Sequence, residues 1–280
     1  MNLEEKIACS VELIRKGEKL AMTLNPQDGY FVGFSGGKDS QALLQLVKMA
    51  DVQYKAYYSV TTNDPPENVY FIRKYYPDVT FLHPKQNFFK LVERKGLPTM
   101  NRRYCCDVLK EKAGVGNVVL TGIRAEESVK RSKYDEVEIS SRRKEHRESK
   151  KKHTIDEIEQ NEHRCIKGKD KLIINPILQW TEKDVWQFLS EQNLPINPCY
   201  EKTGRVGCMF CPFSTKKQIE QYEKKYPKFK ERLLQSLAVF WERHDKHELE
   251  NPEEFYEWWK SKQSLKIFKA KKAQTIMKFK

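Results

Sequence analysis

Six residues that follow a short apolar run carry the most readily identified chemistry in this sequence. The apolar run, residues 30–34, predicts a buried strand, and the leucine spacing over residues 41–49 predicts a helix after it. Glycines at such a junction let the backbone approach an anion, and the first turn of a helix offers unpaired N–H groups and a positive dipole end. The junction therefore predicts a phosphate-binding turn, made of Ser35, Gly36, Gly37, Lys38, Asp39 and Ser40.

Two familiar phosphate-binding motifs do not fit this turn. A Walker A loop requires a glycine where Val32 stands and a serine or threonine where Asp39 stands. The dinucleotide fingerprint GxGxxG requires a glycine where Ser35 stands. The string SGGKDS instead resembles the PP-loop of the adenine-nucleotide α-hydrolase superfamily. A tight strand-to-helix turn that binds no ligand is the alternative interpretation.

A second motif, TGIRAEES over residues 121–128, ends a strand predicted over residues 117–121 and is followed by Arg131. Open parallel sheets bind ligands along the carboxyl edge of their strands, where Arg124 and Arg131 could hold phosphate or sulfate oxygens through paired donors. The alternative is a surface loop with ordinary ion pairs.

The PP-loop resemblance implies binding of ATP or an adenylyl-sulfate type of nucleotide, and many members cleave ATP between the α and β phosphates. It implies that Lys38, Asp39 and Arg124 are catalytic, with Asp39 helping to bind Mg²⁺ beside the pyrophosphate. The implied nucleotide-binding residues are Ser35, Gly36, Gly37, Lys38, Asp39, Ser40, Gly122, Arg124 and Arg131.

Four cysteines form two local pairs that are far apart in the sequence. Cys105 and Cys106 are adjacent, whereas Cys208 and Cys211 form a CxxC motif followed by proline. Four thiolates suit a tetrahedral zinc site or a four-iron cluster, and the spacing alone does not choose between the two. Four buried thiols without a metal are the third interpretation.

The CC pair with a distant CxxC resembles the cluster-binding pattern of adenylyl-sulfate and phosphoadenylyl-sulfate reductases. The resemblance implies that all four cysteines ligate a [4Fe-4S] cluster, and Lys110 matches the basic residue that follows the pair. One departure is that no cysteine follows Cys211, whereas thiol-dependent reductases use a cysteine in a C-terminal tail as nucleophile. Among the other cysteines, we expect Cys165 to be reactive or a substitute ligand, Cys199 to be structural and Cys9 to lie in the core.

Alternating strand and helix patterns after the first helix predict an α/β fold with a parallel sheet. With the motifs above, the expected fold is a Rossmann-like PP-loop fold with a helical C-terminal extension. We predict an N-terminal helix over residues 1–28, a nucleotide-binding domain over 29–215 and a helical, basic region over 216–280. A charged insertion or loop is expected at about 130–171, because this stretch has few large apolar residues.

The net charge of +13 over 280 residues favours a phosphate-bearing partner such as DNA or RNA, contacted through the basic insertion and the C-terminus. A basic surface that only maintains solubility is the alternative. No apolar stretch reaches the ~20 residues of a membrane span, so we expect no membrane association and a cytoplasmic location. Seven cysteines, an odd number, argue against a disulfide framework and for metal or redox chemistry.

The leading functional hypothesis is an ATP-cleaving sulfur transferase that acts in nucleic-acid modification. The chain resembles the ATP-pyrophosphatase type of DNA phosphorothioation and, more distantly, cluster-bearing tRNA thiolation enzymes. That resemblance implies an adenylate or AMP and pyrophosphate as products, and a cysteine desulfurase or another sulfur donor as partner. One alternative is a sulfonucleotide reductase that produces sulfite with a thiol from Cys165 or a partner. Another is a nucleotide- and cluster-binding regulatory subunit without turnover.

Overall fold

The structure is a computed structural model that describes residues 1–140, 154–156, 170–244 and 248–278. The chain divides into two compact units, each assembled from separate stretches of sequence. We call them the sheet unit, which comprises residues 1–59, 66–82 and 112–206, and the helical unit, which comprises residues 60–65, 83–111 and 207–280. The helical unit thus takes two early segments in addition to the C-terminal region in which the sequence predicts helices.

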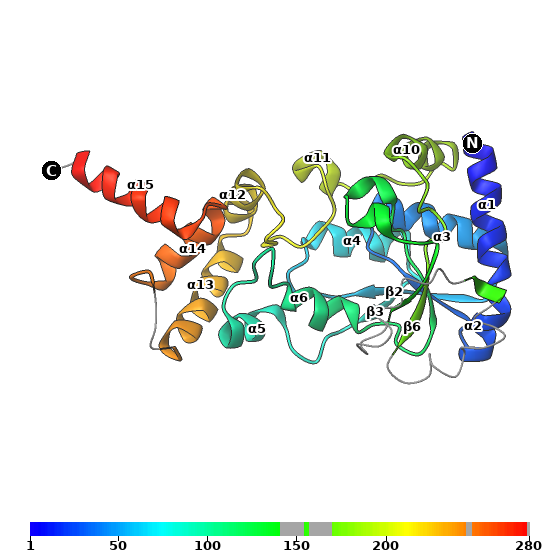
Figure 1. Ribbon diagram of the computed structural model, residues 1–280, viewed down its shortest axis with the longest axis horizontal. Helices are drawn as coiled ribbons and strands as arrows, with labels where there is room; N and C mark the ends of the chain where they lie inside the picture. The colour runs from blue at the N-terminus through cyan, green and yellow to red at the C-terminus, as the bar shows by residue number, and fades with distance from the viewer. Residues whose placement is uncertain (141–153, 157–169, 245–247, 279–280) are drawn as a thin grey trace. The chain divides into compact units, whose positions relative to one another are not determined.

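Six strands form one sheet in the order β3-β2-β1-β4-β6-β5. Their bounds are β1 Tyr30–Gly33, β2 Tyr54–Ser59, β3 Thr80–Leu82, β4 Val118–Leu120, β5 Val137–Ser140 and β6 Lys171–Ile174. The first five strands in this order run parallel to one another, which confirms the predicted α/β class (Figure 1). All three residues of β4 are buried, as expected for a strand covered on both faces.

Strand β5 corrects the interpretation of residues 130–171 as an insertion or loop throughout. It pairs antiparallel with β6 at the edge of the sheet, with Val137 opposite Ile174 and Ile139 opposite Leu172. Two apolar residues that alternate with Glu138 are enough for an edge strand, although the surrounding charge hides the pattern in the sequence. The rest of the basic stretch, 141–153 and 157–169, lies outside the described residues and includes Cys165.

Helices of the sheet unit surround the strands and begin where the sequence offers capping residues. They are α1 Leu3–Lys16, α2 Glu18–Leu24, α3 Lys38–Ala50, α4 Pro66–Tyr75, α10 Glu182–Glu191 and α11 Cys199–Thr203, with short turns η2 Ala125–Glu127 and η3 Arg131–Lys133. Thr181 caps α10 through a capping box with Asp184. Both α1 and α10 pack against α3, the helix that follows the predicted phosphate turn (Figure 1).

The prediction that Cys9 lies in the core is wrong, because Cys9 is exposed on α1. The side of α1 that faces the protein interior is marked instead by the buried Ser10 and Ile14. Cys9 precedes Ser10 by one position, and adjacent positions on a helix point about 100° apart. Cys199, expected to be structural, is buried at the start of α11.

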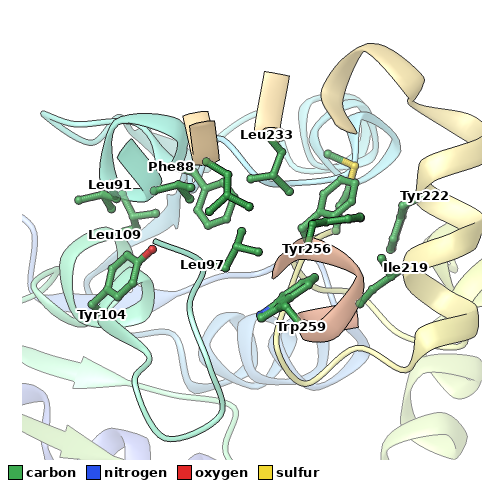
Figure 2. Packing of buried hydrophobic residues seen from close by; sticks show 14 residues of the cluster. Phe88, Leu91, Leu97, Tyr104, Leu109, Ile219, Tyr222, Leu233, Tyr256 and Trp259 are labelled. Carbon is green, nitrogen blue, oxygen red and sulfur yellow. The ribbon is translucent and has the colours of Figure 1, made fainter. Parts of the chain in front are cut away.

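The helical unit packs around a single apolar cluster. Its elements are α5 Phe88–Lys95, α6 Tyr104–Cys106, η1 Asp107–Glu111, α12 Lys216–Lys225, α13 Pro227–Glu242, α14 Pro252–Ser261 and α15 Leu265–Lys278. Figure 2 shows Leu97, Tyr256 and Trp259 gathered with leucines from α5 and α13. Nowhere in the described part of the chain is there a helix with the length and apolar character that crossing a bilayer requires.

Candidate functional site: a phosphate loop and a four-cysteine hollow

The predicted phosphate turn forms a loop between β1 and α3 that depends on glycine. Gly36 has a φ of +77°, and a Cβ there would lie 2.4 Å from Asn68 Oδ1. Gly37 is the N-cap of α3 and provides no side chain to cap the helix. The first turn of a 13-residue helix therefore presents backbone N–H groups to this loop, as an anion-binding helix terminus does.

Two serines close the loop across its base. Ser40 Oγ lies 3.1 Å from Ser35 Oγ, accepts from the Ser35 N–H at 3.2 Å and donates to the Gly37 carbonyl at 2.9 Å. Ser40 is buried, so this contact fixes the loop rather than exposing a free hydroxyl. The structure thus brings the two serines together, with Ser40 in the position of a support for the loop.

Two buried asparagines hold the outer side of the loop. Asn197 Nδ2 donates to the Gly36 carbonyl at 2.9 Å and to Asn68 Oδ1 at 2.7 Å, and Asn68 Nδ2 donates to the Ser35 carbonyl at 3.1 Å. The loop carbonyl groups of Ser35 and Gly36 thus already accept hydrogen bonds, and the groups that the loop still offers to a ligand are donors. The sequence motif contains neither asparagine.

Lys38 lies between carboxylates and aromatic rings, of which the sequence predicted only Asp39 for this site. Its ammonium is 3.5 Å from Glu182 Oε1 and 3.4 Å from Asp39 Oδ2. The same ammonium is 5.9 and 5.8 Å from the ring centroids of Trp186 and Tyr200, which pack edge to face. The positive charge of Lys38 lowers the pKa of the Glu182 carboxyl. Trp186 of α10 is therefore one of the aromatic residues around Lys38.

Tyr200 contacts the start of α3 directly. The Lys38 backbone N–H donates to the Tyr200 hydroxyl at 2.8 Å. Burial raises the pKa of the phenol, so the hydroxyl keeps its proton at neutral pH. Because the oxygen already accepts a hydrogen bond from the helix terminus, its proton remains available for another partner.

Asp39 and Arg124 form the second charged element of the loop. Arg124 Nε lies 2.6 Å from Asp39 Oδ1, and Nη1 lies 2.9 Å from Glu126 Oε2. Arg124 is only 3% exposed, which makes it a buried partner of these carboxylates. A Cβ on Gly122 would lie 2.8 Å from the Asp39 carbonyl, so glycine there allows the loop after β4 to pack against α3.

Arg131, predicted to bind nucleotide with Arg124, has a different partner. Its guanidinium pairs with Glu127 one helical turn earlier, and the side chain is partly exposed. Glu127 in turn accepts from the Arg124 N–H at 3.1 Å. The structure therefore brings Lys38, Asp39, Gly122 and Arg124 together, and links Arg131 to them only through Glu127.

The four predicted metal-binding cysteines line one hollow in the helical unit. Cys105 and Cys106 come from α6, whereas Cys208 and Cys211 come from the turn before α12. Its other lining residues are Thr61, Asn63, Phe88, Leu109, Lys110, Phe210 and Pro212. Within the described residues, no three His, Cys, Asp or Glu side chains are arranged with the geometry of bound-metal ligands. What the fold provides is four thiols facing one space.

Positively charged side chains lie close to these thiols. The Lys110 ammonium bonds to Cys208, and the negative charge of that sulfur raises the pKa of Lys110. A hydrogen bond from Cys105 lowers the pKa of Cys106 to about 6, with Lys110 and Arg103 adding to the effect. Thr61 Oγ1 lies 3.5 Å from Cys208 Sγ. Burial raises the pKa of Cys208, and the hydrogen bond with Cys106 together with burial raises that of Cys105, so of these three thiols Cys106 is the one shifted toward the thiolate, the form in which cysteine binds metals.

Positive charge is concentrated in the cysteine-bearing unit. The helical unit contains 24 Lys and Arg against 14 Asp and Glu, a net charge of +10 out of the total of +13. Several of these lysines are paired, such as Lys272 with Glu254 at 2.7 Å and Lys260 with Glu257 at 2.7 Å. The surplus nevertheless makes this unit the more attractive one for a polyanion.

The fold and the loop define an α/β protein with a phosphate-loop geometry at the carboxyl edge of its sheet. A family model, the phosphoadenosine phosphosulfate reductase domain, matches residues 29–214, and the chain belongs to that family. Membership places the chain among proteins with a nucleotide-binding, sulfur-related role.

Relatives share limited identity with the chain. An uncharacterized protein of Methanocaldococcus jannaschii is 25% identical over 229 residues, which cover 76% of this chain and 42% of that protein. Adenosine 5'-phosphosulfate reductase of Burkholderia cepacia is 28% identical over 151 residues, 49% of this chain and 50% of the reductase. The chain spans about half the length of the curated relatives it matches.

Solved structures with a related arrangement include the phosphoadenylyl-sulfate reductase of Candida auris in a phosphate complex. It is 14% identical, with a TM-score of 0.44, and the match covers 74% of this chain and 93% of that one. The U34-tRNA thiolase NcsA of Methanococcus maripaludis, solved with its [4Fe-4S] cluster, is 16% identical with a TM-score of 0.42, covering 88% of this chain and 82% of that one.

Proposed function

We propose that this protein is an enzyme that cleaves ATP between the α and β phosphates to activate an acceptor for sulfur transfer in nucleic-acid modification. An acceptor oxygen attacks the α-phosphorus, and pyrophosphate leaves with the electrons of the broken bond. The acceptor becomes an adenylate, or AMP forms where water is the acceptor. The observation that carries this proposal is the convergence of Lys38, Asp39 and the N-terminus of α3 on one donor-lined loop.

The loop donors would offset the charge that develops on the phosphates. We assign the Gly36 backbone N–H group and the Lys38 ammonium to phosphate oxygens, because the Gly37 N–H already donates to Ser35 Oγ at 3.4 Å and the Lys38 N–H donates to the Tyr200 hydroxyl. The Tyr200 hydroxyl, which already lies 2.8 Å from the Lys38 nitrogen, would donate its proton to the same phosphate. Preorganised donors of this kind commonly supply the largest part of phosphoryl-transfer catalysis.

Asp39 would be the magnesium ligand of the ATP site. One carboxylate oxygen is bonded to Arg124, which fixes the orientation of the group, while the other lies toward Lys38. Carboxylate oxygens are the protein ligands that Mg²⁺ prefers. Arg124, buried between Asp39 and Glu126, would act by holding this carboxylate, and Arg131 would act through Glu127.

The four cysteines would hold a [4Fe-4S] cluster, with zinc as the alternative metal. The donor set fits either, because four thiols face one hollow and two lysines lie beside them: Lys110 contacts Cys208, and the Lys262 ammonium is 3.1 Å from the carbonyl of Pro212, next to Cys211. When bound, the cluster would hold or relay the sulfur to be transferred. Cys105, Cys106, Cys208 and Cys211 are the proposed ligands.

A nucleic acid would supply the acceptor, and a cysteine desulfurase or another donor would supply the sulfur. Support for a polyanionic partner comes from the net charge of +10 on the helical unit. The basic residues of the 141–153 stretch and the C-terminus would add to this contact. Binding should weaken steeply with salt, because phosphate contacts release counterions.

Pyrophosphate release tests the proposed activity. Protein purified without oxygen would be incubated with ATP and Mg²⁺, with and without DNA or RNA, and pyrophosphate and AMP would be measured. We expect pyrophosphate from the wild type and none from Lys38→Ala, with Lys48→Ala as an exposed control on the same helix. A wild type that hydrolyses ATP only to ADP would overturn the proposal, because that cleavage breaks a different bond.

A second candidate is a sulfonucleotide reductase that releases sulfite. The observation in its favour is that relatives matched over part of the chain are named adenosine 5'-phosphosulfate reductases. This reaction requires a thiol to attack the substrate sulfur and a reductant to release sulfite afterwards. Sulfite from adenosine 5'-phosphosulfate or its 3'-phosphate, abolished by Cys165→Ser, would favour this candidate. Nucleotide binding with neither product would favour a regulatory subunit.

A further inference from the structure

The backbone between Cys208 and Cys211 is held by one buried asparagine from a distant part of the sequence. Asn63 Oδ1 accepts from the Phe210 N–H at 3.1 Å, and Asn63 Nδ2 donates to the Phe210 carbonyl at 3.2 Å. The Asn63 carbonyl also accepts from the Met209 N–H at 2.8 Å. Met209 and Phe210 are the two residues between the cysteines, so one residue binds both of them.

This contact lies inside the helical unit and is closed to water. Asn63 is 3% exposed and Phe210 is fully buried, with its ring stacked on Phe229 at 5.4 Å. The turn is thus held from two sides, by the apolar core at the ring and by Asn63 at the backbone. A two-bond amide clamp in a buried place allows little movement of the peptide groups it holds.

The clamp comes from the connection between β2 and α4, residues 60–65, which has its own internal order. The Thr61 N–H donates to Asp64 Oδ2 at 2.7 Å, and the Asn63 N–H donates to Thr61 Oγ1 at 3.2 Å. The Phe88 N–H donates to Thr62 Oγ1 at 2.7 Å, which ties the connection to the start of α5. Asn63 is therefore presented by a rigid support.

We propose that Asn63 is a positioning residue that sets the separation of the Cys208 and Cys211 thiolates for metal binding. Fixing the three peptide groups between the two cysteine Cα atoms, through the Met209 N–H, the Phe210 N–H and the Phe210 carbonyl, fixes the directions in which the cysteine Cβ atoms leave the backbone. Ligands held by such outer contacts bind metal roughly 10–100-fold more tightly than ligands without them. The inference rests on the proposed cluster, since it concerns the ligands of that group.

The test compares two Asn→Ala variants in the same unit. Asn63→Ala removes the clamp, whereas Asn251→Ala removes the N-cap of α14, whose Oδ1 accepts from the Glu254 N–H at 2.8 Å. Each loses buried or capping hydrogen bonds and some stability, but only the first touches the cysteine turn. Wild type and both variants are purified without oxygen, iron and sulfide are measured per chain, and the half-life of the visible cluster absorption is followed with an iron chelator.

We expect Asn63→Ala to lose its cluster at least ~10-fold faster than both wild type and Asn251→Ala. Urea unfolding of the metal-free proteins gives the second readout, because a merely structural role would make cluster loss follow stability in both variants. Equal half-lives for the two variants at similar stability would overturn the inference while the proposed cluster stands. A wild type with neither iron nor sulfide would overturn the cluster itself.

Asn63→Asp keeps the test decisive if Asn63→Ala is not recovered in folded form. It retains an oxygen that can accept from the Phe210 N–H, but replaces the donor to the Phe210 carbonyl with a second acceptor. We expect its cluster half-life to be shorter than that of the wild type. A half-life equal to the wild type would show that the clamp does not position the thiolates.

Discussion

The phosphate loop and the cysteine hollow are built in opposite ways. The loop is one continuous string between β1 and α3, and its shape is set by Gly36 and by backbone hydrogen bonds. The hollow is assembled from three separate segments, which supply the CC pair, the CxxC turn and the clamp of Asn63. The first site is thus organised locally, whereas the second depends on tertiary packing of the helical unit.

This difference bears on how each site would bind its ligand. Backbone donors fixed by a glycine turn need little rearrangement to receive a phosphate, because their positions are set by the chain itself. Thiols from two segments that a third segment holds depend on every contact between these segments, so their geometry is easier to lose. The two sites also lie in different compact units. We therefore expect substitutions to separate nucleotide binding from metal binding.

Removing one cysteine should have the largest effect, and it should impair metal binding without impairing nucleotide binding. Cys208→Ala removes a proposed ligand that also bonds Lys110. We expect a large loss of iron and sulfide, because cysteine thiolates hold iron–sulfur clusters and the variant lacks one of the four proposed ligands. The affinity for a non-hydrolysable ATP analogue, measured by calorimetry, should stay within about twofold.

A parallel fall in nucleotide affinity would contradict this separation of the two sites. Unfolding in urea must be recorded for Cys208→Ala, so that a general loss of folded protein is not mistaken for coupling. Cys9→Ala, at an exposed cysteine on α1, is the matched control and should retain both ligands.

Lys38→Ala should have the converse effect. Loss of the ammonium removes a charge-assisted contact to phosphate worth about 1.5–3 kcal/mol, or roughly 10–150-fold in affinity. Iron content should be unchanged. Lys48→Ala lies on the same helix at an exposed position and should bind the nucleotide normally. Wild-type affinity in Lys38→Ala would exclude the loop as the phosphate site.

The sequence predicts this protein best where the chemistry depends on contiguous residues. The string from Ser35 to Ser40 and its strand–turn–helix context were predicted from contiguous residues, and the α/β class followed from alternating patterns. Glu182, Tyr200 and Asn197 were missed at this site because they join it from segments about 150 residues away. No local pattern reports such a contact, since it depends on how α10 and α11 pack around α3.

At the cysteine hollow, too, the sequence predicts the residues of a known motif but not the distant residue that contacts them. Its four thiols were grouped by resemblance to a known pattern, and the structure places all four on one hollow. Asn63 was not predicted, because a single asparagine in a loop has no distinguishing signal. Strand β5 was missed because Val137 and Ile139 are only two apolar residues among many charged ones.

A comparison of two glycines with similar positive φ angles can show how tightly the phosphate loop is packed. Gly36 has a φ of +77° and Gly116 a φ of +81°, but only at Gly36 would a Cβ meet neighbours, with nothing within 4 Å at Gly116. Gly116→Ala should cost about 1–2 kcal/mol of unfolding free energy from its backbone conformation alone. Gly36→Ala should cost about 1–3 kcal/mol more, because the new methyl displaces Asn68.

Urea unfolding of the two variants gives this difference, and nucleotide titration gives its consequence. Gly36→Ala should weaken nucleotide binding, whereas Gly116→Ala should not, since it lies outside the loop. Equal unfolding energies for the two would show that the loop yields easily to an added methyl. The phosphate loop would then be less rigid than we infer from its glycine turn and backbone hydrogen bonds.

Tyr200→Phe should have the smallest effect and gives the sharpest test of how complete the loop is before nucleotide binds. The change keeps the ring beside Trp186 and Lys38 and removes only the hydroxyl that accepts from the Lys38 N–H. If the phenol proton goes to a phosphate oxygen, nucleotide affinity should fall about 2–10-fold, less than in Lys38→Ala because the phenol itself carries no charge. Tyr70→Phe, at an exposed position on α4, is the control.

Tighter binding by Tyr200→Phe would mean that the hydroxyl occupies the place of a phosphate oxygen and must leave. The loop would then have to release the Tyr200 hydroxyl before it binds a nucleotide. The phosphate loop would therefore be less preorganised for its ligand than the comparison with the cysteine hollow assumes.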